Sequence, residues 1–190
     1  MDPFDSMVAR ENGKEWTSDF RAQSNSLNPF GDGAADFLLQ LLASLLPAAS
    51  GDGAKWQEKA INMVDAVIRT LCYKRARGEI EISVATFRHY LALKNLVELY
   101  KEGQQGLIPE TAYLPIKAYF ETGLPGFNPD LVDDPSKWDA EVFNQHGYLT
   151  GQFSRIFSMM MDTYSHVFSD KYPEIDMMDV LLNDRLLVVM

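Results

Sequence analysis

Residues 53–76 read GAKWQEKAINMVDAVIRTLCYKRA, and this stretch decides the fold class of the chain. Its apolar residues recur at the spacing that places them on one side of a helix. Gly78 then follows as a typical helix end. We therefore predict one amphipathic helix over about 53–76, whose buried side carries Trp56, Ala60, Met63, Val64, Val67, Ile68 and Leu71.

Helical spacing continues on both sides of this stretch. A leucine-rich helix is predicted over about 33–46, where Pro47 ends it. Downstream, Ser83 is an expected N-cap, because its hydroxyl can accept a hydrogen bond from the first turn. Pro109 fits the first turn of a further helix that stops near Gly123.

The last third of the chain predicts the longest helix. Ser136 is an expected N-cap, and the apolar stripe that follows favours one helix over about 137–169. A short helical turn is expected near Asp176 to Leu182, and an apolar, β-branched run over 185–190 is predicted to be a truncated β-strand. The sequence thus indicates an all-α, multi-helix fold with a terminal strand.

The terminal strand also bears on domain organisation. It stops without a turn residue, and no other stretch offers it a confident partner, so we expect the sequence to be a piece of a longer protein. We predict a loosely ordered lead-in over 1–31, an all-helical domain over 32–183, and part of an adjoining domain over 184–190.

Composition restricts the classes of function. The 190 residues are 46% hydrophobic, which argues against wholesale disorder, and the net charge of -10 argues against a general nucleic-acid binder. Lys74, Arg75 and Arg77 form the densest basic spot. They are predicted either to complement the dipole of a helix C-terminus or to make a weak DNA contact.

Motifs for chemistry are absent from the sequence. A P-loop requires Gly-x4-Gly-Lys-Ser/Thr, which occurs nowhere in the chain. His89, His146 and His166 lack the spacing of a metal-ligand pair, and Cys72 stands alone in an apolar helical segment. We expect no catalytic residue, cofactor or metal in these residues, and without a signal peptide or long apolar span we expect a soluble piece.

Aromatic residues near two loops offer a binding surface. Tyr113, Phe127 and Trp138 lie close in sequence to the loops over 103–106 and 124–135. Aromatic side chains are frequent anchors at protein interfaces, so these three are predicted to contact a partner protein. The alternative is that they only pack in the core.

Four stretches carry a resemblance to a known family. They are SNSLNPF (24–30), QHGYLTGQFSR (145–155), DTYSHVF (162–168) and IDMMDVLLNDRLLVV (175–189). In this order they resemble the type IV secretion coupling proteins of the branch with plasmid-transfer TrbC and Dot/Icm DotL. In that family an all-α domain is inserted between strands of a membrane-anchored, hexameric, RecA-like ATPase.

The resemblance implies that the chain is this helical insertion and that 184–190 rejoin the motor sheet. ATP and magnesium would then be bound only by the parent motor domain. Implied partners are relaxosome or secretion-substrate proteins and other subunits of the hexamer. The implied location is the cytoplasmic side of the bacterial inner membrane, without direct membrane contact. A stand-alone helical adaptor and a weak DNA-contacting module remain the alternatives.

Overall fold

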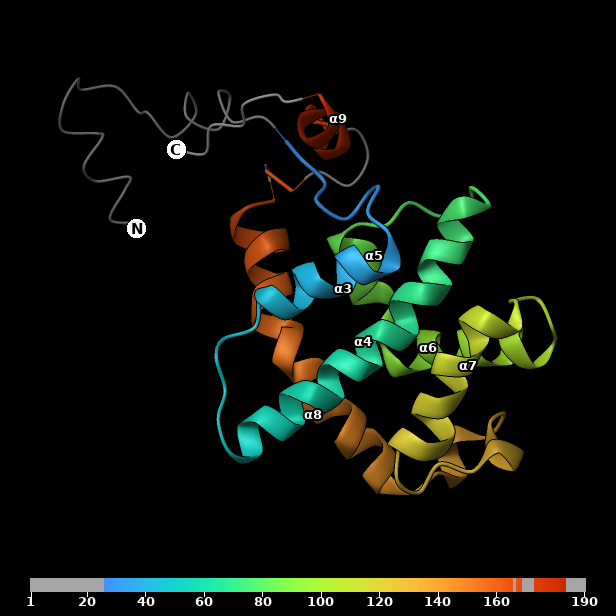
Figure 1. Cartoon of the computed structure of the whole chain (residues 1–190). Helices are drawn as coiled ribbons and strands as arrows, with labels where there is room; N and C mark the ends of the chain where they lie inside the picture. The colour runs from blue at the N-terminus through green and yellow to red at the C-terminus, as the bar shows by residue number, and fades with distance from the viewer. Residues whose placement is uncertain (1–25, 166, 169–172, 184–190) are drawn as a thin grey trace.

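Helix α4 (Asp52–Ala76) runs through the middle of the structure, a computed structural model that describes residues 26–165, 167–168 and 173–183. It packs against α3 (Ala35–Ser44), α7 (Glu110–Ala118) and α8 (Ala140–Ser158), as Figure 1 shows. The helix predicted over 53–76 is therefore confirmed. Because α4 has neighbours on several sides, its buried residues extend around the helix: Ala60, Met63, Val64, Ala66, Val67, Ile68, Thr70, Leu71 and Lys74.

The other elements are also helical, so the all-α class is confirmed for the described residues. They include α5 (Val84–Tyr90) and α6 (Leu93–Gln104), the π-helical η1 (Tyr119–Gly123) and η4 (Met159–Thr163), the 3-10 turns η2 (Pro129–Leu131) and η3 (Pro135–Lys137), and α9 (Met177–Leu182). Ser83 caps α5 as predicted, because its Oγ accepts a hydrogen bond from the backbone N–H of Thr86. Among the described residues, no helix is long and apolar enough to cross a membrane.

The long helix predicted over about 137–169 is present but shorter, because the helical backbone runs from Ala140 to Thr163. Ser136 lies in η3, and the helix proper starts at Ala140, where the side chain of Asp139 accepts a hydrogen bond from the N–H of Glu141 at 2.9 Å. After α8 the backbone widens into the π-helical η4, which ends at Thr163. Apolar residues keep a nearly helical spacing through this change of backbone, so the sequence pattern did not reveal it.

The core begins within the stretch predicted as a lead-in. Phe30 is fully buried and its ring meets that of Phe87 edge-on, with centroids 5.3 Å apart. The Asn28 side chain donates to the carbonyl of Ile82 at 2.8 Å. Helix α3 then starts at Ala35, and no side chain caps its first turn with a hydrogen bond. The terminal strand predicted over 185–190 lies outside the described residues.

The start and the end of the described fold lie side by side. The N–H of Leu27 donates to the carbonyl of Val167 at 2.7 Å, and the N–H of Ile175 donates to the carbonyl of Ser26 at 2.9 Å. Leu27 forms parallel β-bridges with Phe168 and Ile175. We call this group, residues 26–27, 167–168 and 174–175, the entry–exit clamp.

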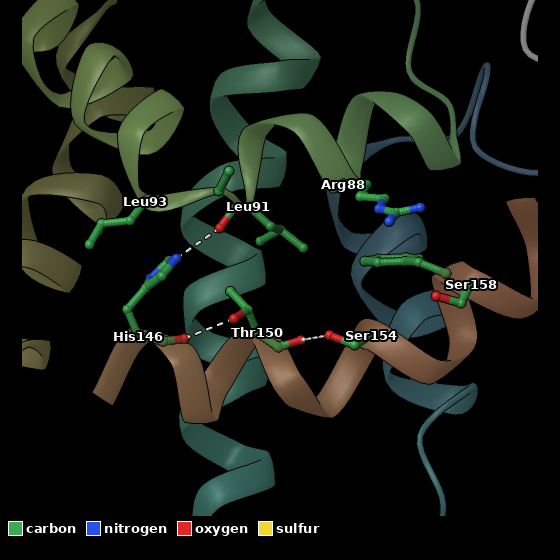
Figure 2. A pocket seen from close by; sticks show the side chains of 9 residues that line it. Arg88, Leu91, Leu93, His146, Thr150, Ser154 and Ser158 are labelled. Carbon is green, nitrogen blue, oxygen red and sulfur yellow. Dashed lines mark hydrogen bonds between the residues drawn. The ribbon is translucent and has the colours of Figure 1, made fainter. Parts of the chain in front are cut away.

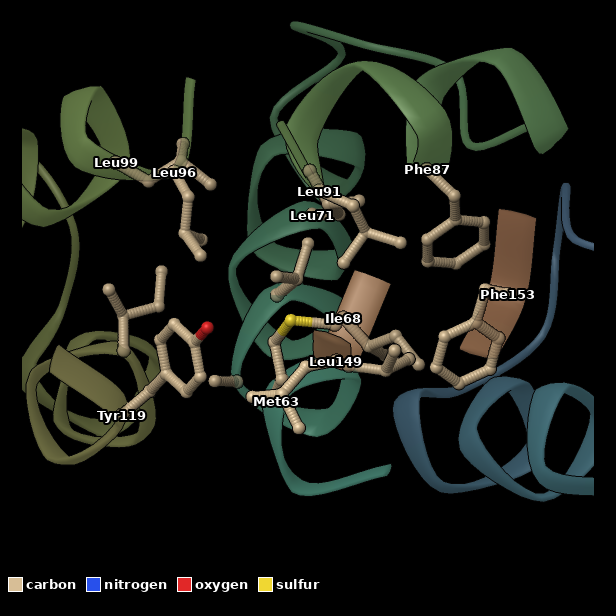
Figure 3. Close-up of a cluster of buried hydrophobic side chains, with 14 of the residues drawn as sticks. Met63, Ile68, Leu71, Phe87, Leu91, Leu96, Leu99, Tyr119, Leu149 and Phe153 are labelled. Atoms are coloured by element: carbon tan, nitrogen blue, oxygen red, sulfur yellow. The ribbon is translucent and has the colours of Figure 1, made fainter. Parts of the chain in front are cut away.

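The core joins α4 to α5 and α8 in one continuous cluster. Figure 3 shows Phe87 of α5 and Leu91, the residue after α5, pointing towards Phe153 and Leu149 of α8, with Ile68 of α4 between them. These five side chains are at most 4% exposed. Their packing fixes the distance between α5 and α8, and a surface pocket lies where these elements meet.

Candidate functional site

A half-open pocket of about 320 Å³ lies between α8 and the junction of α5 with α6. We call it the α5–α8 pocket. One wall comes from α8 and the other from the junction, as Figure 2 shows. Its lining consists of Arg88, Leu91, Ala92, Leu93, His146, Thr150, Ser154, Phe157 and Ser158.

His146 closes one end of the pocket and is only 5% exposed. Leu91 lies in the break between α5 and α6, and its carbonyl is 2.8 Å from His146 Nε2. A carbonyl can only accept, so Nε2 carries the proton and Nδ1 accepts from the hydroxyl of Tyr119 at 2.7 Å. Both ring nitrogens are therefore engaged within the protein.

Burial also determines the charge of this pair. Loss of solvent lowers the pKa of His146 below its ordinary value of 6.5, because the charged imidazolium is disfavoured in the interior. Burial likewise raises the pKa of Tyr119. The pair is neutral near pH 7 and ties α8 to η1 and to the α5–α6 junction, so it acts as a structural support of the pocket.

The α8 wall of the pocket is lined by hydroxyl groups one helical turn apart. Thr150 Oγ1 donates to the carbonyl of His146 at 3.0 Å, and Ser154 Oγ donates to the carbonyl of Thr150 at 3.2 Å. Ser158 continues the row. Since the hydroxyl hydrogens of Thr150 and Ser154 point to α8 carbonyls, these oxygens offer acceptors to a ligand.

Arg88 provides the positive charge of the pocket. It is exposed at the opposite end from His146 (Figure 2). Its one hydrogen-bond contact among the described residues is to the thioether sulfur of Met161 at 3.8 Å. A thioether is a weak acceptor, so the guanidinium keeps most of its donors available.

The three predicted partner-binding aromatics lie together, but mainly in the interior. Phe127 and Trp138 meet edge-on at 5.3 Å, and Tyr113 joins them through the ring of Tyr100. Trp138 is 8% exposed and its indole N–H donates to the carbonyl of Leu131 at 2.7 Å. Phe127 and Tyr113 are half-buried against the core. Their partner-binding role stays a prediction.

The predicted DNA-contacting cations have partners inside the domain. Lys74 is nearly buried and pairs with Glu102 at 2.6 Å and with Glu79 at 3.4 Å. Arg75 donates to three backbone carbonyls in the turn over 30–33. The more exposed Arg77 pairs with Glu79. These contacts join the end of α4 to its neighbours, and the DNA contact stays a prediction.

Sequence reasoning did not identify the α5–α8 pocket. The pocket joins residues near 90 with residues near 150, and a single sequence does not show that these two helices pack together. The only local signal is the regular row Thr150, Ser154 and Ser158 beside the buried Phe153 and Phe157. In the described part of the chain, no three His, Cys, Asp or Glu side chains are grouped to hold a metal ion.

The chain is similar in sequence to a known coupling protein. No protein-family model matches the chain. The chain is 36% identical over 179 residues to the type 4 coupling protein DotL of Legionella pneumophila. The match covers 88% of this chain and 22% of that protein, so the chain spans about a fifth of the length of this relative. The similarity and the helical fold agree with the family resemblance of the four sequence stretches.

Proposed function

We propose that this chain is the all-α domain of a type IV secretion coupling protein and that it recognises cargo for the secretion system. In a full-length coupling protein it would bind relaxosome or secretion-substrate proteins at the cytoplasmic mouth of the hexamer. It would thereby select or gate what enters the channel. The ATP and magnesium would be held by the motor domain of that larger protein.

The observation that carries this proposal is the similarity to a type 4 coupling protein over 88% of the chain. The match leaves only about an eighth of the chain uncovered. A domain of this acidic, helical kind suits reversible contacts with proteins. The row of α8 hydroxyls and the exposed Arg88 offer polar contacts on one face.

The entry–exit clamp supports the proposal that this domain is an insertion. Ser26 and Ile175 are joined by a backbone hydrogen bond of 2.9 Å, so the chain enters and leaves the helical body at one place. A domain with adjacent ends can be inserted in a loop of a host domain without distorting it. We propose that the host is the RecA-like motor.

The test is a domain deletion in the full-length coupling protein. Residues 28–173 are replaced by a short Gly/Ser linker, which can span the gap because Ser26 and Ile175 are already hydrogen-bonded. We expect plasmid or substrate transfer to be lost while ATP hydrolysis and hexamer assembly are retained. Normal transfer by the deleted protein would contradict the recognition role.

A motor-defective variant of the same parent is the matched control. It should lose both ATP hydrolysis and transfer, whereas the deletion should lose transfer alone. Loss of ATP hydrolysis and of hexamers in the deletion would assign the domain to assembly of the motor instead of recognition.

A further inference from the structure

We propose that the α5–α8 pocket binds an acidic side chain of a partner protein, with the carboxylate on Arg88 and an adjoining apolar side chain against Leu91 and Phe157. This inference rests on the proposed function, because it assigns the recognition of a partner to a defined place. The occupant is a short segment of a second protein that carries a Glu or Asp next to an apolar residue.

The charge arrangement around Arg88 carries the argument for a carboxylate. Arg69 and Arg77 of this chain pair with carboxylates, and Arg75 is held by three carbonyls. Among the described residues Arg88 contacts only a sulfur and Arg155 has no carboxylate partner, although the chain has 27 acidic residues for 17 basic ones, and of these two arginines only Arg88 lines the pocket. A guanidinium with free donors at the end of a pocket matches the geometry of a carboxylate.

The hydroxyl row favours a peptide over a free phosphate. Thr150 and Ser154 already donate their hydrogens to α8 carbonyls, so they present oxygen acceptors to the pocket. A phosphate needs several donors around it, and here Arg88 would be the main source. A peptide brings its own backbone N–H groups, which can donate to these hydroxyl oxygens.

The volume and the apolar floor of the α5–α8 pocket limit how large a bound group can be. A volume of about 320 Å³ is at the small end of ligand sites and accommodates one or two side chains, not a whole helix. Leu91 and Phe157 are buried at the floor, and His146, whose Nε2 meets the Leu91 carbonyl, has no free ring nitrogen. The floor therefore suits an aliphatic side chain, while Arg88 and Ser158 suit the neighbouring acid at the other end (Figure 2).

The experiment titrates the ¹⁵N-labelled 190-residue chain with acetyl-Ala-Leu-Glu-Leu-Ala-amide and follows the backbone amides by NMR. The same peptide with Gln in place of Glu, and sodium acetate, are titrated in parallel. We expect saturable shifts at Ala92, Thr150 and Ser158 with the Glu peptide. The Gln peptide should bind roughly tenfold more weakly, because it loses the charge-assisted hydrogen bonds to Arg88.

Two variants and one control test whether the Glu peptide binds in the pocket and through Arg88. Arg88→Gln should lower the affinity for the Glu peptide to the affinity that the wild type has for the Gln peptide. Ser154→Phe should block the pocket without changing any charge. Arg155→Gln is the matched control, because Arg155 is an exposed arginine of α8 that does not line the pocket, and it should leave binding unchanged.

The proposal is overturned by equal binding of the Glu and Gln peptides, by equal effects of Arg88→Gln and Arg155→Gln, or by the lack of any saturable shift. Acetate binding as tight as the peptide would also overturn it, since the site would then take simple anions. Transfer by the full-length coupling protein that carries Arg88→Gln tests the pocket separately from the proposed function. If domain deletion abolishes transfer while the peptides fail to bind, the pocket is wrong and the proposed function stands.

Discussion

Ser26 and Glu174 lie 148 positions apart in sequence and are joined by two hydrogen bonds in opposite directions. The N–H of Ser26 donates to Glu174 Oε2 at 3.0 Å, and the N–H of Glu174 donates to Ser26 Oγ at 3.2 Å. Both bonds are exposed. They add side-chain contacts to the backbone pairing of the entry–exit clamp.

Replacing Ser26 by Ala should loosen this clamp locally. The variant loses the acceptor for the Glu174 N–H, which costs about 1 kcal/mol, or roughly fivefold in hydrogen-exchange protection at Leu27 and Ile175. Ser44→Ala is the control, since Ser44 Oγ donates to an exposed backbone carbonyl of its own helix. Equal loss of protection throughout α4 would show that the clamp is not a local unit.

Removing the Thr70 hydroxyl should destabilise the whole domain. Thr70 is fully buried, and its Oγ1 donates to the carbonyl of Ala112 at 2.9 Å, linking α4 to α7. Thr70→Val keeps the shape but removes this added donor from the Ala112 carbonyl of α7, so the free energy of unfolding should fall by about 1 kcal/mol in urea denaturation. Thr122→Val removes a similar bond at an exposed site and should have less effect.

Stability should fall as the pH drops below neutrality, because of His146. Burial lowers the pKa of His146 in the folded protein, whereas the unfolded chain takes up a proton near the ordinary value of 6.5. Below that pH the unfolded state binds more protons, so the stabilisation present above it is progressively lost until the folded pKa is reached.

The measurement is the urea midpoint as a function of pH for the wild type and for His146→Gln. The variant should be less stable at neutral pH but should show a smaller decline between neutral pH and pH 5.5. His89→Gln is the control, because His89 is exposed. Parallel pH profiles for the wild type and His146→Gln would contradict this origin of the decline.

Trp138→Ala should separate packing from partner binding among the predicted aromatics. Trp138 is 8% exposed, packs on Phe127 and donates to the carbonyl of Leu131, so its loss should cost about 3–5 kcal/mol of folding stability. Phe143→Ala, at a neighbouring ring that is 45% exposed, should cost much less. Thermal denaturation of both variants is therefore needed before any pull-down with Trp138→Ala is interpreted.

Local signals in the sequence were sufficient for several elements. The periodicity of 53–76 predicted α4, and the hydroxyl of Ser83 predicted the start of α5, because both depend on neighbours within one or two turns. The long helix was predicted, but its bounds and its π-helical turn at Met159–Thr163 were not, since this turn hardly alters the spacing of apolar residues. Periodicity reports which side chains are buried, and it does not report which backbone carbonyl each N–H meets.

The pocket depends on contacts that no local pattern records. His146 was considered only as a metal ligand, whereas it bonds Tyr119 and the carbonyl of Leu91, 27 and 55 positions away. No residue near Arg88 in the sequence marked it as part of a binding site. Its importance appears only once the packing of α5 against α8 brings it to the same pocket as Ser158.

The entry–exit clamp has a thermodynamic consequence for any domain that carries this chain as an insertion. Closing a flexible loop of about 150 residues costs roughly 3 kcal/mol more chain entropy than closing a turn of about four residues. The folded helical body holds Ser26 and Glu174 together, so the host meets only the cost of a short connection. If the helical body unfolded, the host would have to close the whole stretch as a flexible loop. The stabilities of the two parts are therefore coupled.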